Sequence, residues 1–172
     1  ASMQVIGMPN SVISDGAGGF YFTSSEQNRL YRVAANGTRS VIAGSPYGLD
    51  GYSGDGGPAA AAGLAAPAGV ARDAAGNFYI ADTLNHRIRK VTPNGVIATI
   101  AGTGTQGFKG DGSPANSAQL NSPSSVAVDF AGNVYIADQL NNRIRKITPD
   151  GTINTVAGNG KKQYAGAGGP AT

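Results

Sequence analysis

The sequence predicts an all-β fold built from three copies of one unit of about 56 residues. Residues 67–104 reappear at 123–160 with 25 of 38 positions identical, and a looser copy at 9–46 shares 14 of 38 with the second unit. Apolar residues come in short runs instead of at helical spacing, and 27 glycines and 9 prolines separate these runs. Long repeats are typical of solenoids and propellers, in which each unit buries its faces against its neighbours.

The second unit reads as four antiparallel strands joined by tight turns. Gly76 and Asn77 favour a hairpin turn after the first strand, and Pro93-Asn94-Gly95 favours another before the fourth strand. The expected strands are 69–73, 78–81, 87–91 and 96–100. Four antiparallel strands per repeat are typical of a β-propeller blade.

The repeat predicts one propeller segment over residues 1–172, with no division into further domains. The expected blades span approximately 9–44, 67–102 and 123–158, and Gly-rich linkers at 45–66 and 103–122 join them. Within the second linker, residues 113–120 carry Ser-Pro and are expected to form one helical turn, with counterparts at 57–64 and 169–172.

Composition excludes several classes of site. The chain has no cysteine, so disulfides and thiolate metal sites are excluded. The net charge is +3, but only 13% of residues are charged and no run of Lys or Arg exceeds two, which argues against a nucleic-acid protein. No membrane span and no secretory signal are expected, and the compartment is left open.

Two motifs of the repeat resemble the NHL-repeat family of β-propellers. They are Gly76–Asp82 with Asn85–Lys90, and Gly132–Asp138 with Asn141–Lys146. The Gly-Asp-Gly-Gly-Pro-Ala stretch at 54–59 resembles the bacterial branch, which has long loops between blades. The resemblance implies a propeller but not one function, since the family includes scaffolds, RNA binders, sensor domains and a few lyases. The resemblance also implies one option for localisation, which is an exported or cell-surface location as part of a longer bacterial protein.

Three blades are fewer than the four to eight of most propeller rings. Residues 171–172 fall at the same repeat phase as 1–2, 59–60 and 115–116. We therefore expect the chain to associate with itself, two chains forming a six-bladed ring, the commonest number in the family that it resembles. A nine-bladed trimer is less favoured. The alternative is a fragment of a longer array whose ring closes within one chain.

A carboxylate and an arginine recur together around the turn after the second strand. We expect Asp82 with Arg87, and Asp138 with Arg143, to be structural turn pairs, because a residue repeated in every unit usually holds the blade itself. Binding of a substrate or cation is the alternative. The first unit has Ser24 at the Asp position and must hold its turn differently.

Metal sites have weak support in the sequence. The related lyases need several histidines at the hub, and His86 is the only histidine here, so we expect it in an exposed turn. Asp50, Asp55 and Asp111 lie in Gly-rich loops that favour Ca²⁺ only weakly, with one carboxylate per loop. No cofactor and no resident metal are expected.

Basic and aromatic residues offer a second type of binding surface. Arginines and lysines of the third strands form a repeated band, and Tyr52, Phe108 and Tyr164 occupy one aligned loop position. Some animal relatives of the NHL type bind single-stranded RNA on a basic face, so phosphate contacts with base stacking are one hypothesis. The favoured interpretation is that the aromatic residues anchor the linkers and the arginines form ion pairs between blades. The band comprises Arg29, Arg32, Arg87, Arg89, Lys90, Arg143, Arg145 and Lys146.

Together these patterns predict a non-catalytic binding or assembly module, a scaffold that binds protein or a small ligand at the hub or on one face. The alternatives are a propeller that binds RNA or an anionic ligand, and a fragment of a propeller lyase or hydrolase. No catalytic residue is expected. The predicted ligand face carries the turns between second and third strands together with the linkers, and comprises Asn28, Asn85, His86, Asn142, Tyr52, Phe108 and Tyr164.

Overall fold

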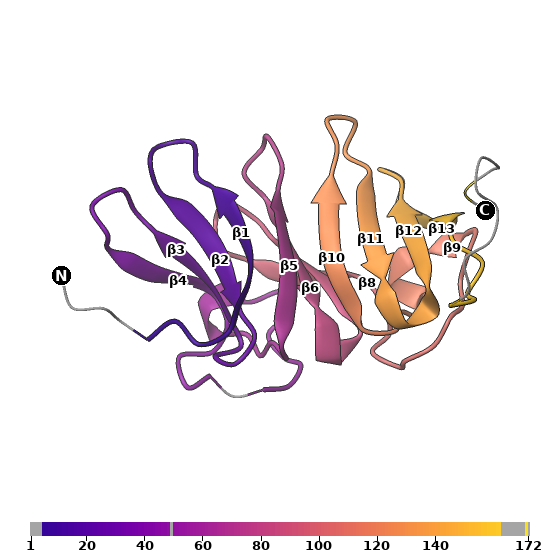
Figure 1. The fold of residues 1–172 in the computed structure, drawn as a ribbon, viewed down its shortest axis with the longest axis horizontal. Coiled ribbons are helices and arrows are strands. Elements are labelled where there is room, and N and C mark those ends of the chain that lie inside the picture. Colours follow the sequence, from indigo (N-terminus) through magenta and orange to yellow (C-terminus); the bar gives the residue numbers. More distant parts are fainter. Residues whose placement is uncertain (1–4, 49, 163–170, 172) are drawn as a thin grey trace.

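The computed structural model describes residues 5–48, 50–162 and 171, and consists of three antiparallel sheets standing side by side in chain order (Figure 1). In each sheet four consecutive strands pair as a meander, which is the arrangement of a propeller blade, and the third sheet gains a short fifth strand from the linker. Blade 1 contains β1 (Pro9–Ser14), β2 (Phe20–Ser24), β3 (Arg29–Val33) and β4 (Arg39–Ala43). Blade 2 contains β5 (Pro67–Arg72), β6 (Phe78–Asp82), β7 (Arg87–Val91) and β8 (Ile97–Ala101). Blade 3 contains β10 (Pro123–Val128), β11 (Val134–Asp138), β12 (Arg143–Ile147) and β13 (Thr152–Ala157).

The apolar runs become strands because neighbouring blades cover them on both faces. All five residues of β6 are buried, as expected for a strand with blades on either side. The hydrophobic core is accordingly split between the two junctions. One cluster joins Leu30 of blade 1 to Val70 of blade 2, and the other joins Ile88 of blade 2 to Val126 of blade 3.

Each linker connects two blades through hydrogen bonds at both of its ends. In the second linker, β9 (Ser113–Pro114) pairs with β13 of blade 3, and the 3-10 turn η3 (Ala115–Ser117) follows it. The carbonyl of Ala115 accepts the N–H of Gly102 in blade 2 at 3.0 Å. The first linker repeats this with η1 (Ala59–Ala61), whose Ala59 carbonyl accepts the N–H of Gly44. The expected helical turn is therefore present in both linkers, as a 3-10 turn; residues 169, 170 and 172 of the third counterpart lie outside the described part of the chain.

Two sets of loops lie at opposite ends of the strands. The linkers and the turns between second and third strands, including the 3-10 turns η2 (Thr83–Asn85) and η4 (Gln139–Asn141), lie at one end (Figure 1). We call this end the linker face. The turns between first and second strands lie at the other end, which we call the hairpin face. No helix in the described part of the chain is long and apolar enough to span a membrane.

Candidate functional site

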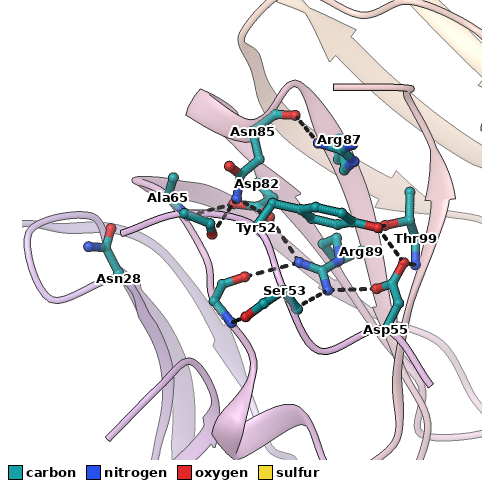
Figure 2. A network of polar contacts seen from close by, with 12 residues as sticks. Asn28, Tyr52, Ser53, Asp55, Ala65, Asp82, Asn85, Arg87, Arg89 and Thr99 are labelled. Carbon is teal, nitrogen blue, oxygen red and sulfur yellow. Dashed lines mark hydrogen bonds and ion pairs between the residues drawn. The ribbon is translucent and has the colours of Figure 1, made fainter. Parts of the chain in front are cut away.

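A fully buried arginine connects two strands of blade 2 with the linker that precedes them (Figure 2). Arg89 on β7 places Nη1 3.2 Å from Oδ2 of Asp82 at the end of β6, and Nη2 2.6 Å from Oδ1 of Asp55 in the linker. Its Nη1 and Nη2 also donate to the linker carbonyls of Gly63 and Ser53. The guanidinium therefore fixes the linker against its own blade.

The Asp82 carboxylate uses both oxygens for internal contacts. Oδ1 accepts the N–H of Ala65 at 2.7 Å, and Oδ2 accepts Nδ2 of Asn85 at 2.9 Å as well as the guanidinium of Arg89. Burial raises the pKa of the Asp82 carboxyl, and these hydrogen bonds together with the charge of Arg89 act in the opposite direction. No oxygen of this carboxylate is directed at solvent, since the side chain has no exposed surface.

Blade 3 repeats the same arrangement with its own residues. Arg145 lies 3.4 Å from Asp138 and 2.7 Å from Asp111, and Asp138 accepts the N–H of Asn121 at 2.7 Å. We call these two sets the polar locks: Asp55, Asp82 and Arg89 in blade 2, and Asp111, Asp138 and Arg145 in blade 3. In both locks the arginine and the strand aspartate are fully buried and the linker aspartate is about one third exposed, which indicates a structural role in the blade.

Blade 1 holds its turn without a lock. Ser24 replaces the aspartate, and its Oγ accepts the N–H of Gln27 at 3.2 Å. Tyr31 replaces the buried arginine; its hydroxyl donates to Oε1 of Gln27 at 2.9 Å and accepts from Arg29 at 3.0 Å. An aromatic ring thus fills the space that a guanidinium occupies in the other two blades.

The predicted partner of each lock aspartate was wrong. Asp82 pairs with Arg89 and not with Arg87, and Asp138 pairs with Arg145 and not with Arg143. Side chains two residues apart on a strand lie on the same face, so both arginines of each strand could reach the carboxylate in principle. Arg87, at the first position of β7, instead donates to the carbonyls of Asn85 and Thr103.

The aromatic residues of the linkers cover these outer arginines. The guanidinium carbon of Arg87 lies 3.6 Å from the ring centroid of Tyr52, and that of Arg143 lies 3.7 Å from the ring centroid of Phe108. The Tyr52 hydroxyl donates to Oδ2 of Asp55 at 2.8 Å. Tyr52 and Phe108 therefore anchor the linkers, as the favoured sequence interpretation holds. The second part of that interpretation was wrong: in the described part of the chain, the arginines of the third strands form ion pairs within their own blade or with a linker, and not between blades. Tyr164 lies outside the described residues.

These contacts weaken the support for two other sequence hypotheses. Arg89 and Arg145 are fully buried and cannot contact a phosphate, so the basic band is interrupted in the middle of both strands. Asp55 and Asp111 each bind a guanidinium through Oδ1, and a calcium ion would have to compete with this ion pair for the carboxylate.

Three residues of the predicted ligand face, Asn28, His86 and Asn142, occupy one structural position after the second strand. Each has a positive φ, between 50° and 54°. Oδ1 of Asn28 accepts the N–H of Ala66 at 2.8 Å, and Nδ1 of His86 accepts the N–H of Ser122 at 3.0 Å. Both side chains thus hold the residue that leads into the next blade.

His86 is half-buried in this junction and not fully exposed as expected. Burial lowers the pKa of its imidazole, which favours the neutral ring that accepts a hydrogen bond at Nδ1. Asn85 is also engaged, since its Nδ2 donates to the carbonyl of Gly51 at 2.8 Å. The structure therefore places most residues of the predicted ligand face together on the linker face. Their side chains, however, make contacts within the chain that stabilise the fold.

Sequence reasoning missed the central residues of the locks. It considered Arg89 and Arg145 only as members of the basic band, and it did not single out Asn141, whose Nδ2 donates to Asp138 at 2.7 Å. The sequence does contain a signal for these residues. One motif recurs unchanged at the same spacing from the aspartate, as Asn85-x-Arg87-x-Arg89 and as Asn141-x-Arg143-x-Arg145.

The turns of the hairpin face contain a second repeated carboxylate. Oδ1 of Asp129 accepts the N–H of Asn133 at 2.8 Å, and Oδ2 accepts Nδ2 of the same residue at 2.7 Å. Asp73 makes the same two bonds with Asn77. The side-chain bond from Asn133 lowers the pKa of Asp129 below its ordinary value.

This pKa predicts an acid-dependent contribution to stability. Because the folded-state pKa of Asp129 is depressed, its contribution is present above the unfolded value of 3.8 and is lost as the pH falls through the folded value. We expect Asp129→Asn to reduce the loss of stability between about pH 5 and pH 2. Urea unfolding of both proteins at each pH measures this; an unchanged pH dependence would contradict the assignment.

Comparisons with known proteins agree with the blade architecture. A family profile described as the teneurin NHL domain matches residues 49–109 and 104–168. The chain is 35% identical over 133 residues to the chloroplastic protein SUPPRESSOR OF QUENCHING 1 of Arabidopsis thaliana, covering 74% of this chain and 12% of that protein. It is 41% identical over 86 residues to mouse teneurin-1, covering 42% of this chain and 3% of that protein. The chain thus spans a small part of these relatives.

Solved structures give the same result. An auxiliary nutrient binding protein from Bacteroides thetaiotaomicron superposes with a TM-score of 0.66 at 25% identity, over 86% of this chain and 36% of that chain. Virginiamycin B lyase from Staphylococcus aureus superposes with a TM-score of 0.58 at 15% identity, over 88% of this chain and 41% of that chain, and shares the fold. The repeated motifs, the four-stranded blades and the family match together show that the chain belongs to the NHL-repeat family of β-propellers.

Proposed function

We propose that the chain is a non-catalytic assembly module whose two end blades bind each other across copies, so that two chains form a six-bladed ring. The observation that carries the proposal is a difference in burial between equivalent residues. Positions that are buried at the two junctions inside the chain are exposed at its two end blades.

The outer surface of blade 1 exposes apolar residues whose equivalents are buried. Val12 is 66% exposed, whereas the equivalent Val70 and Val126 are 4% and 6% exposed. Ile6 is 43% exposed, and the equivalent Leu64 and Leu120 have no exposed surface. Phe20 is likewise exposed, although the residues at its equivalent positions in the other two blades are buried. We call Ile6, Val12 and Phe20 the leading face.

The outer surface of blade 3 carries the complementary half of such a junction. Ile144 is 38% exposed, whereas the equivalent Leu30 and Ile88 are fully buried against the next blade. Ala137 and Ala157 are half-buried although Ala81 and Ala101, their equivalents in blade 2, are fully buried. A hollow of about 290 Å³ lies over Ala137, Ile144 and Ala157, which we call the trailing face.

The internal junctions are the template for the proposed contact. At both, a Leu or Ile of the third strand packs in one cluster with a Val of the next blade's first strand: Leu30 with Val70, and Ile88 with Val126. Ile144 and Val12 are the corresponding pair between two copies. Each chain carries one face of each kind, and a two-fold pair therefore makes two identical junctions.

A polar group accompanies the apolar pair. At the internal junctions Asn28 and His86 accept a backbone N–H of the following blade. Asn142, at the same position, lines the hollow of the trailing face, and its Nδ2 donates to the carbonyl of Gly160 at 3.3 Å. Its Oδ1 is placed to accept a backbone N–H of an incoming blade.

A binding role is favoured over catalysis because the repeated ionisable groups are used internally. In each lock one arginine binds two carboxylates within the chain, and His86 is committed to a junction. The similarity to a nutrient-binding propeller is in line with a binding role. Binding of single-stranded RNA loses support because two basic residues of the proposed band are buried.

Cysteine cross-linking tests the junction, and the chain has no cysteine of its own. Purified Val12→Cys and Ile144→Cys variants are mixed in urea, refolded together so that both can enter one ring, and then oxidised mildly. We expect disulfide-linked pairs of one variant with the other, because both side chains belong to one predicted cluster. A mixture of Ile144→Cys with Leu84→Cys is the control, since Leu84 is 61% exposed in a turn that the proposed junction does not use. Equal cross-linking in both mixtures, or none in either, would overturn self-association. The end faces would then serve a blade of another polypeptide.

A further inference from the structure

The two junctions inside the chain differ at one position of the second strand. At the first junction, the ring of Phe78 packs edge-on against Tyr21 of blade 1, with the ring centroids 4.6 Å apart. At the second junction the equivalent of Phe78 is Val134, whereas the equivalent of Tyr21 is again a tyrosine, Tyr79. The second junction therefore lacks an aromatic ring that the first junction contains.

A cavity of about 410 Å³ lies between blades 2 and 3, with Val134 in its wall. Blade 2 supplies Tyr79 and Lys90, blade 3 also supplies Ile147, and the linker between the two blades supplies Pro114. The rest of the lining comes from the same three segments, so the cavity is complete within one chain and does not depend on ring closure. We call it the inter-blade cavity.

Lys90 holds its ammonium on the side of blade 2 that faces this cavity. Lys90 and Tyr79 are paired residues of β7 and β6, so their side chains lie on one face of the sheet. Tyr79 belongs to the hydrophobic cluster that blade 2 shares with blade 3, which shows that this face is turned toward blade 3. Nζ of Lys90 lies 5.5 Å from the ring centroid of Tyr79, and both residues line the inter-blade cavity.

The fold does not use the donors of this ammonium. At the same position of blade 1, Arg32 forms a salt bridge with Asp15 at 2.8 Å. In blade 2 the equivalent carboxylate, Asp73, accepts the hydroxyl of Tyr79 and donors of its own turn instead. In the described part of the chain, no salt bridge or hydrogen bond includes the side chain of Lys90. Its three N–H donors are therefore available to a ligand.

We propose that the inter-blade cavity binds a small aromatic monocarboxylate, with the ring against Tyr79 and Val134 and the carboxylate at the ammonium of Lys90. A hydrogen bond between an ammonium and a carboxylate is charge-assisted and is stronger than one between neutral groups. The apolar walls of the cavity pack on the ring.

The first junction provides the geometric precedent for this arrangement. There the ring of Tyr21 is contacted by the ring of Phe78, and the guanidinium carbon of Arg32 lies 5.9 Å from the same ring centroid. An aromatic ring and a cation thus approach one tyrosine together. At the second junction the tyrosine and the cation come from the chain, and the ligand supplies the missing ring.

The carboxylates around the cavity restrict the charge of the ligand. Asp150 lines the cavity, and Asp73 accepts the hydroxyl of Tyr79 at 3.0 Å. The oxygens of Asp150 accept the N–H and the hydroxyl of Thr152 in their own turn. The negative charge of both aspartates disfavours dianions such as phosphate esters, and a ligand with one carboxylate is therefore preferred.

Ligand titration followed by NMR of the full chain tests the proposal. Phenylacetate is the probe, with acetate, cyclohexylacetate and benzylamine as comparisons. We expect saturable shifts at Tyr79, Val134 and Ile147 with phenylacetate, weaker binding of cyclohexylacetate, and none with acetate or benzylamine. Binding of benzylamine at the same residues would overturn the assignment of Lys90 and would identify the aspartates as the recognising groups.

Two variants separate the contacts of the charge and of the ring. Lys90→Gln is expected to weaken phenylacetate binding about tenfold or more, because a hydrogen bond to a charged group is lost. Val134→Phe is expected to abolish binding while the melting temperature is kept or raised, because the new ring fills the cavity as Phe78 fills the first junction.

Lys146→Gln is the matched control. Lys146 is the equivalent of Lys90 in blade 3, and its Nζ lies 5.7 Å from the ring centroid of Tyr135, outside the inter-blade cavity. This variant should bind phenylacetate as the unmodified chain does. Equal losses in Lys90→Gln and Lys146→Gln, full binding by a folded Val134→Phe, or no saturable binding by the unmodified chain up to about 10 mM would refute the proposal.

Discussion

Replacing Arg89 with leucine is expected to lower the free energy of unfolding by about 3–5 kcal/mol, the usual cost of removing one partner of a buried ion pair. The guanidinium is fully buried, and its loss leaves the buried carboxylate of Asp82 without its counter-ion. Asp55 and two linker carbonyls lose a donor at the same time. Urea unfolding followed by circular dichroism measures the effect.

Arg87→Leu is the matched control for this prediction. Arg87 lies two residues earlier on the same strand and the same face, but its guanidinium stacks on Tyr52 at the surface. We expect a loss of about 1 kcal/mol, from the stacking and two hydrogen bonds to carbonyls. If Arg87→Leu destabilised the chain as much as Arg89→Leu, the buried lock would not be the main polar support of the blade.

Replacing Gly102 with alanine is expected to destabilise the chain by about 3 kcal/mol. Gly102 has a φ of +91°, which costs an alanine about 1–2 kcal/mol. A β-carbon there would also overlap the carbonyl oxygen of His86, which adds a steric cost of about 1–3 kcal/mol. The same clash recurs at Gly44 with Asn28 and at Gly158 with Asn142, so the close approach is a feature of every blade.

Gly95→Ala measures the backbone-conformation part of that cost alone, so the difference between the two variants is the steric part. Gly95 has a φ of +80°, but a β-carbon there would meet nothing within 4 Å. We expect a loss of about 1 kcal/mol in the same unfolding experiment. Equal losses at the two glycines would show that backbone conformation alone, and not the approach to His86, determines the requirement for glycine.

The fold was predictable because several independent features of the sequence favour the same four-stranded blade. Glycines at the turns, short apolar runs and a repeat of long period all favour four-stranded sheets, and the strands lie close to where these signals place them. The family resemblance rests on the same residues that turn out to form the second strand and the lock.

The details of the lock were not predictable from spacing. Arg87 and Arg89 both recur, both follow the same aspartate and both point to one face of the strand, so the sequence cannot show which one turns inward. Asp55 joins the lock from a position 34 residues before Arg89, through a linker whose path depends on the packing of the blades. Only the three-dimensional structure brings these groups together.

The exposed end faces illustrate another limit of sequence patterns. Val12, Val70 and Val126 look alike in the aligned units, although one is mostly exposed and two are buried. Burial of a blade face depends on its neighbour and not on its own residues.

The mass of the chain in solution tests self-association most directly. Light scattering after size-exclusion chromatography, over a dilution series, should give a mass near twice 17.2 kDa that persists on dilution. Val12→Lys should then shift the mass toward the monomer, because the charge would be buried in both junctions. A mass of 17.2 kDa at every concentration would contradict the six-bladed assembly of two chains.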